Sequence, residues 1–88
     1  MSYKLSELPK IVLDIQNNIA NENYDDAENK LLDVVKYYPD EPDLLYNLGE
    51  LKRKKKNIKE AVRYLSRSIM LNPENVYALN SLGCAYLE

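Results

Sequence analysis

The stretch Pro42–Asn75, PDLLYNLGELKRKKKNIKEAVRYLSRSIMLNPEN, decides the fold, because the residues on either side can be laid onto it in register. Several of its residues have an identical residue 34 positions away in the chain. The pairs include Pro39 and Pro73, Ala27 and Ala61, Leu48 and Leu82, and Gly49 and Gly83. A fixed period of this length is typical of stacked helical repeats, so the sequence predicts a helical solenoid.

Two amphipathic helices are expected within this stretch. Apolar residues recur every three or four positions from Leu44 to about Lys55, as they do on one face of a helix. A second helix is expected from Asn57 to Pro73, with Asn57 as its cap and Glu60 completing a capping box. The apolar faces consist of Leu44, Leu45, Leu48 and Leu51, then Ile58, Ala61, Val62, Leu65 and Ile69. Together the two helices predict a helical hairpin.

The chain resembles the tetratricopeptide repeat family at the positions of that family's signature. The residues that carry the resemblance are Leu48, Gly49, Ala61, Leu65, Ser68 and Pro73. Leu45, Lys52 and Lys56 depart from the signature, which favours tryptophan, an aromatic residue and glycine there. The resemblance implies an all-α fold, a right-handed α-α superhelix (solenoid) of helix-turn-helix repeats, here with about five helices.

We expect one domain over residues 1–88, with a first repeat at about 8–41, a second at about 42–75 and a half repeat at 76–88. In the first repeat, Ser6 is expected to cap a helix with Pro9 in its first turn, and Asn23 to cap a second helix that lasts until Pro39. In the half repeat, no second helix follows to cover Leu79, Leu82 and Tyr86. Three interpretations follow: the last helix is itself the terminal cap of the solenoid, or another chain covers it, or the chain belongs to a longer array of repeats.

Acidic residues predominate in the first repeat and basic residues in the second. Residues 8–41 hold 3 basic and 8 acidic residues, and residues 42–75 hold 8 basic and 4 acidic ones, although the whole chain has a net charge of only −2. The run Lys52–Lys56 fits a solvated helix end whose cations complement the helix dipole. An acidic partner, or the acidic half of a second copy, is an alternative. An overall acidic chain without clustered aromatic residues near this run disfavours nucleic acid.

Composition argues against catalysis. The chain has no histidine, a single cysteine and no glycine-rich phosphate loop, so we expect a non-enzyme without cofactor or metal. Asp25 and Asp26 fit the start of a helix, and Cys84 fits a small filler residue. The stretch Met1 to Glu7 lacks the apolar core of a signal peptide, and no later run is long enough to cross a membrane. We therefore expect a cytoplasmic protein without membrane insertion.

The resemblance implies that partners bind a concave wall formed by the first helix of each repeat. The positions that face this wall would be Pro9, Val12, Leu13, Gln16, Ile19, Ala20, Asp43, Tyr46, Asn47, Glu50, Arg53, Lys54, Tyr77, Asn80, Ser81, Cys84, Leu87 and Glu88. The expected partner-binding residues among them are Val12, Leu13, Gln16, Tyr46, Asn47, Glu50, Tyr77, Asn80 and Ser81. The apolar members could hold side chains of a peptide, and the amides could hydrogen-bond its backbone.

Members of the family that bind chaperone tails use a clamp of lysine, arginine and asparagine around a terminal carboxylate. The corresponding positions hold Val12, Gln16, Asn47, Tyr77 and Ser81, of which only Asn47 matches the clamp. The sequence therefore disfavours binding of such tails.

Two hypotheses for function follow. The first is an adaptor or scaffold that binds a protein or peptide in the concave groove. The second is a structural module that self-associates, as a homo-oligomer, through Leu79, Leu82 and Tyr86 of the uncovered last helix. A repeat region of a larger protein is a third interpretation.

Overall fold

The computed structural model describes residues 3–88, which form five α-helices and one short 3-10 helix without any strand. The helices are η1 (Leu5–Glu7), α1 (Leu8–Ala20), α2 (Tyr24–Val35), α3 (Pro42–Lys54), α4 (Ile58–Leu71) and α5 (Val76–Tyr86). The predicted all-α solenoid of about five helices is confirmed. Met1 and Ser2, the first residues of the stretch tested for a signal peptide, lie outside the described residues.

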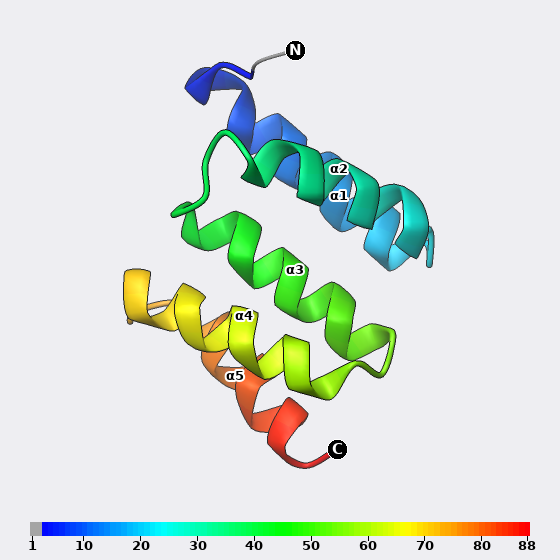
Figure 1. Ribbon diagram of the computed structural model, residues 1–88, viewed down its shortest axis with the longest axis vertical. Helices are drawn as coiled ribbons and strands as arrows, with labels where there is room; N and C mark the ends of the chain where they lie inside the picture. Colours follow the sequence, from blue (N-terminus) through cyan, green and yellow to red (C-terminus); the bar gives the residue numbers. More distant parts are fainter. Residues whose placement is uncertain (1–2) are drawn as a thin grey trace.

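The helices form two hairpins, α1 with α2 and α3 with α4, and α5 packs against the second hairpin. These units stack along the longest axis of the molecule, which measures 38 × 27 × 18 Å, and the chain ends lie at opposite ends of the stack (Figure 1). The central helix α3 contacts α1 and α2 on one side and α4 and α5 on the other. Because α3 contacts both α1 and α5, the first helix of each unit contributes to one common wall.

The apolar faces predicted from the sequence supply the core. Its largest fully buried side chains include Ile15, Leu31, Leu44, Leu48, Leu51 and Leu65. The α3 and α4 helices make the most extensive contact in the structure, and Ala61 is completely buried there. Gly49 faces the same contact, where an added Cβ would lie 2.5 Å from Leu65 Cγ. The small residues therefore allow the close approach of helices that the sequence predicted.

The two hairpin turns have the same backbone geometry, 34 positions apart. Glu22 and Lys56 both adopt a left-handed conformation, with φ of 62° and 66°. The next residue in each turn, Asn23 or Asn57, donates its backbone N–H to the carbonyl five residues earlier at 2.8 Å. This bond closes the end of the preceding helix. The repeat boundaries proposed at 41/42 and 75/76 stay a prediction.

Three local predictions were wrong. Ser6 lies within the 3-10 helix η1 rather than at a helix cap, and α1 begins at Leu8 with Pro9 in its first turn. The Asn23 and Asn57 side chains cap neither α2 nor α4. Asn57 instead donates its side-chain amide to Glu60, whose carboxylate also pairs with Lys52. The α2 helix ends at Val35, short of Pro39.

Candidate functional site: a groove along the first helices

The wall of first helices carries three pockets. The central pocket, of about 510 Å³, is lined by Gln16, Ile19, Ala20, Glu22, Tyr24, Tyr46, Asn47, Glu50 and Lys54. The second, of about 420 Å³, is lined by Leu5, Leu8, Pro9, Val12, Glu41 and Asp43. The third, of about 310 Å³, is lined by Gln16, Asp43, Tyr46, Asn72, Glu74, Asn75, Val76 and Tyr77.

These pockets adjoin one another, because Gln16 and Tyr46 line both the central and the third pocket and Asp43 lines both the second and the third. Together they form one depression along α1, α3 and the start of α5, which we call the α1–α3–α5 groove. A continuous groove of this kind suits an extended peptide or a helix better than a small molecule.

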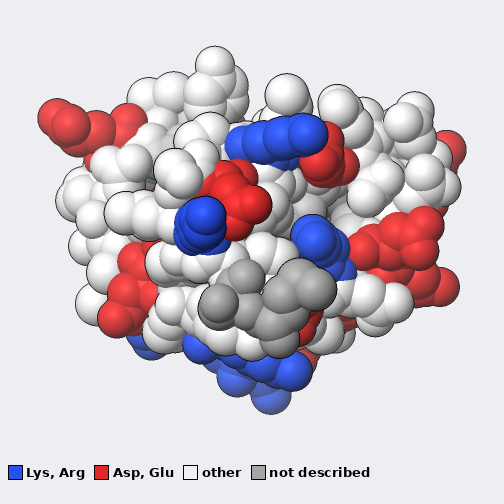
Figure 2. Space-filling model, turned by 90° about the horizontal axis from the view of Figure 1, so that it is seen from above, with Lys and Arg blue, Asp and Glu red and all other residues white. Residues whose placement is uncertain are grey.

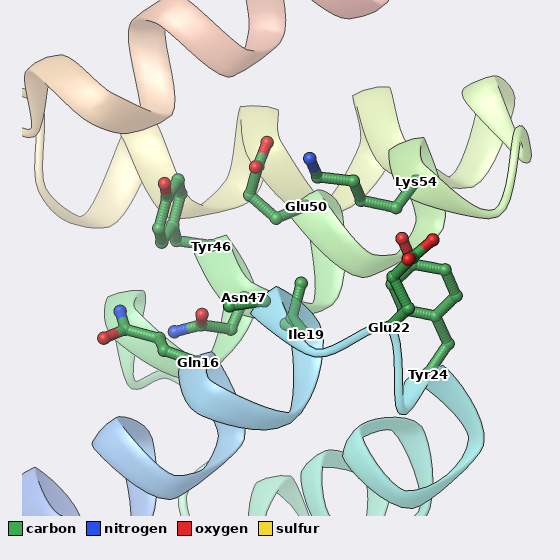
Figure 3. Close-up of a pocket in the computed structure, with 9 residues that line it drawn as sticks. Gln16, Ile19, Glu22, Tyr24, Tyr46, Asn47, Glu50 and Lys54 are labelled. Carbon is green, nitrogen blue, oxygen red and sulfur yellow. The ribbon is translucent and has the colours of Figure 1, made fainter.

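Side chains from two helices face each other across the central pocket (Figure 3). Tyr46, Glu50 and Lys54 follow one another along α3, where a spacing of four residues places them on one side of the helix. Gln16 and Ile19 approach from α1. The lining of the pocket thus combines apolar side chains, such as Ile19, with polar and charged ones.

Asn47 supplies a hydrogen-bond acceptor to the central pocket. Its side chain is 2% exposed, and its Nδ2 donates to the Asp43 carbonyl at 2.7 Å. Nδ2 is the donor in this bond, so the amide oxygen Oδ1 is the acceptor atom of the side chain. Within residues 3–88, no buried side-chain oxygen or nitrogen lacks a hydrogen-bond partner, so Oδ1 is not an unpaired buried atom. An amide oxygen has two lone pairs, and Oδ1 could accept a hydrogen bond from a ligand in the pocket.

Glu50 is held in its ionised form. Burial by itself would raise the pKa of Glu50, but hydrogen bonding from Arg53 and Ser81 outweighs burial and lowers the pKa below its ordinary value of 4.5. Arg53 bonds to Glu50 at 3.1 and 3.3 Å. Burial raises the pKa of Tyr46, and the Glu50 carboxylate adds to this effect, so Tyr46 stays a neutral phenol. Glu50 is therefore a carboxylate at neutral pH, and Arg53 is its ion-pair partner.

The structure brings six of the nine predicted partner-binding residues into the groove. They are Val12, Gln16, Tyr46, Asn47, Glu50 and Tyr77. Leu13, Asn80 and Ser81 line none of the three pockets. Leu13 is 55% exposed on α1, whereas Ser81 is buried.

Sequence reasoning missed the groove residues that lie outside the first helices. Glu22 belongs to the turn after α1, Tyr24 begins α2, and Glu74 lies in the loop before α5. A helical period indicates which residues share a face of one helix, but it says nothing about loop residues. The left-handed conformation of Glu22, which sets its position, is a finding of the structure and has no signal in the sequence.

The basic run Lys52–Lys56 is largely paired within the chain rather than simply solvated. Lys52 and Lys55 bind the Glu28 carboxylate at 2.6 and 2.8 Å, and Lys52 also reaches Glu60 at 3.1 Å. The acidic first half and the basic second half therefore meet at the contact between the hairpins. This pairing leaves less of the charge separation available for a partner.

The described part of the chain gives no metal site, since residues 3–88 contain no group of three or more His, Cys, Asp or Glu side chains able to hold an ion. Within the same residues, no helix is both long and apolar enough to cross a membrane.

Stacked helical hairpins with a groove along their first helices define this chain as a helical-repeat protein. The family model described as tetratricopeptide repeat matches residues 18–83, three quarters of the chain. The chain belongs to the tetratricopeptide repeat family, whose members are generally non-catalytic protein-interaction modules. No curated protein and no solved structure matched the chain in the two other comparisons.

Proposed function

We propose that this chain is a non-catalytic adaptor that holds a peptide or helix of a partner protein in the α1–α3–α5 groove. The observation that carries the proposal is the continuity of the groove past Gln16, Tyr46 and Asp43, each of which lines two pockets. An extended segment would place side chains in successive pockets, and Asn47 and Gln16 would hydrogen-bond its backbone or side chains. Binding in a cytoplasmic setting is part of this proposal.

Selection from a displayed library of random peptides tests the adaptor. Peptides selected on the wild-type chain should lose binding to Tyr46→Ala, because this substitution removes the aromatic side chain shared by two pockets. Tyr37→Ala is the matched control, since Tyr37 is 42% exposed and lines none of the three pockets. Circular dichroism should show that both variants are folded. Failure to select any peptide, or equal binding to wild type and Tyr46→Ala, would contradict groove binding.

Self-association through α5 is a second candidate function. It is favoured by a comparison of Gly49 and Gly83, which occupy equivalent positions of the repeat. Gly49 is covered by Leu65 of α4, whereas a Cβ added to Gly83 would meet nothing within 4 Å. On the same side of α5, Leu79 is 46% and Tyr86 67% exposed, while Leu45, the counterpart of Leu79 in α3, is 3% exposed. A second copy of the chain would bury this apolar face.

A further inference from the structure

The α1–α3–α5 groove concentrates negative charge. Its lining includes five carboxylates and a single ammonium group, Lys54. The carboxylates are Glu22, Glu41, Asp43, Glu50 and Glu74. Five negative charges against one positive charge give the groove a net charge of −4, whereas the whole chain has −2, so all residues outside the lining sum to +2. The groove is therefore much more acidic than the rest of the molecule.

Most of these carboxylates are available to a ligand. Glu22, Asp43 and Glu74 are exposed and form no ion pair within residues 3–88. Glu50 shares its charge with Arg53, which in turn also contacts Glu88 at 3.3 Å. The uncompensated charge thus lies on three elements: the turn after α1, the start of α3 and the loop before α5.

An independent feature points to a hydrogen-bond donor in the same groove. Asn47 lines the central pocket, where its amide oxygen Oδ1 can accept a hydrogen bond from a ligand donor. Ile19 and Tyr46 line the same pocket and offer apolar surface. A ligand group that has an apolar stem, a positive charge and several N–H donors would satisfy all of these features, and lysine and arginine side chains have this chemistry.

The charge pattern elsewhere directs a basic ligand to the groove. In Figure 2, acidic side chains lie at both sides of the face shown, acidic and basic side chains lie next to each other near its centre, and a basic cluster lies at its lower edge. A pocket of about 610 Å³ beside α4 is lined by Arg63 and Arg67 and by no carboxylate. Like charges would repel a basic segment from that pocket.

We infer that the partner segment held in the groove is basic, and that a lysine or arginine side chain enters the central pocket beside Tyr46 and donates to Asn47 Oδ1. Further basic side chains of the segment lie against Asp43 and Glu74. The inference rests on the proposed function and adds the chemical class of the partner. It also gives a reason for the lost clamp residues, since a groove with net negative charge repels a terminal carboxylate.

Two charge variants test the inference on a selected peptide. Asp43→Asn with Glu74→Gln removes two groove carboxylates, and Asp14→Asn with Asp26→Asn removes two exposed carboxylates outside the groove. Asp43 and Asp26 both lie in the first turn of a helix. Each double variant therefore removes one carboxylate that interacts favourably with a helix dipole, so the two variants are matched in this respect. Fluorescence anisotropy would measure the affinity of a labelled selected peptide, and of a copy with each Lys and Arg replaced by Gln.

We expect the selected peptides to be positively charged and the Gln copy to bind about tenfold or more weakly. The groove variant should weaken binding roughly three- to tenfold, the control variant should not, and salt should weaken wild-type binding. Selected peptides that are neutral or acidic but still require Tyr46 would overturn the inference and leave the adaptor standing. Equal weakening by both charge variants would also overturn it, because it would show attraction to the overall charge rather than to the groove.

Discussion

At the scale of single residues, the two glycines of the repeat occupy opposite environments. A Cβ at Gly49 would lie 2.5 Å from Cγ and 2.7 Å from Cδ2 of Leu65, a fully buried side chain with no room to move. Gly49→Ala should therefore destabilise the fold by roughly 1 to 3 kcal/mol through overpacking, measured by urea denaturation.

Gly83→Ala is the matched control for this prediction. Open space surrounds Gly83, and its backbone is helical, so alanine should stabilise α5 by about 0.5 to 1 kcal/mol. Equal free energies of unfolding for the two variants would contradict the environments that the structure assigns to these glycines.

At the scale of helices, one ion-pair cluster joins three elements. Glu28 of α2 binds Lys52 of α3, and Lys52 also binds Glu60 of α4, with the Glu28 and Lys52 side chains 18% and 16% exposed. Glu28→Gln should lower the free energy of unfolding by about 1 to 2 kcal/mol, between the values for exposed and buried pairs. Asp25→Asn, which removes a 92% exposed carboxylate at 3.6 Å from Lys55, should have almost no effect.

The same cluster predicts a dependence on pH. Hydrogen bonds from Lys52, and then from Lys55, lower the pKa of Glu28 below its ordinary value of 4.5. A carboxyl group with a lowered pKa in the folded state stabilises the fold above pH 4.5, and this contribution is lost as the pH falls through the folded-state pKa. The stability difference between wild type and Glu28→Gln should therefore shrink in acid, and thermal melts over a pH series would measure it. A difference that stays constant into acid would contradict the pairing.

At the scale of the whole molecule, the uncovered face of α5 predicts association. No charged residue occurs in Val76–Tyr86, and Leu79, Leu82 and Tyr86 share one side of this helix. Sedimentation equilibrium should show a concentration-dependent dimer that Leu82→Glu disrupts, because a carboxylate would be buried without a partner. Leu32→Glu, at a 42% exposed leucine of α2, is the control and should leave the dimer intact. A wild-type chain that is monomeric at every concentration would contradict self-association.

The sequence by itself determined the helices, their pairing into hairpins and the close contact at Gly49 and Ala61. These features follow from local periodicity and from the 34-residue repeat, both of which can be read along one chain. It also predicted most of the helical residues of the groove, because a helical face repeats every three to four positions.

Only the tertiary structure decided which side chains from different elements meet. Glu28 and Lys52 are 24 positions apart in the chain, and Glu22, Tyr24 and Glu74 reach the groove from turns and helix ends. Their placement depends on how one hairpin stacks on the next. No local sequence pattern indicates which side chains this stacking brings together. The stacking of the hairpins also decides where the charges lie. Among the described residues, it pairs Glu28 with Lys52 between the hairpins and gathers unpaired carboxylates in the α1–α3–α5 groove.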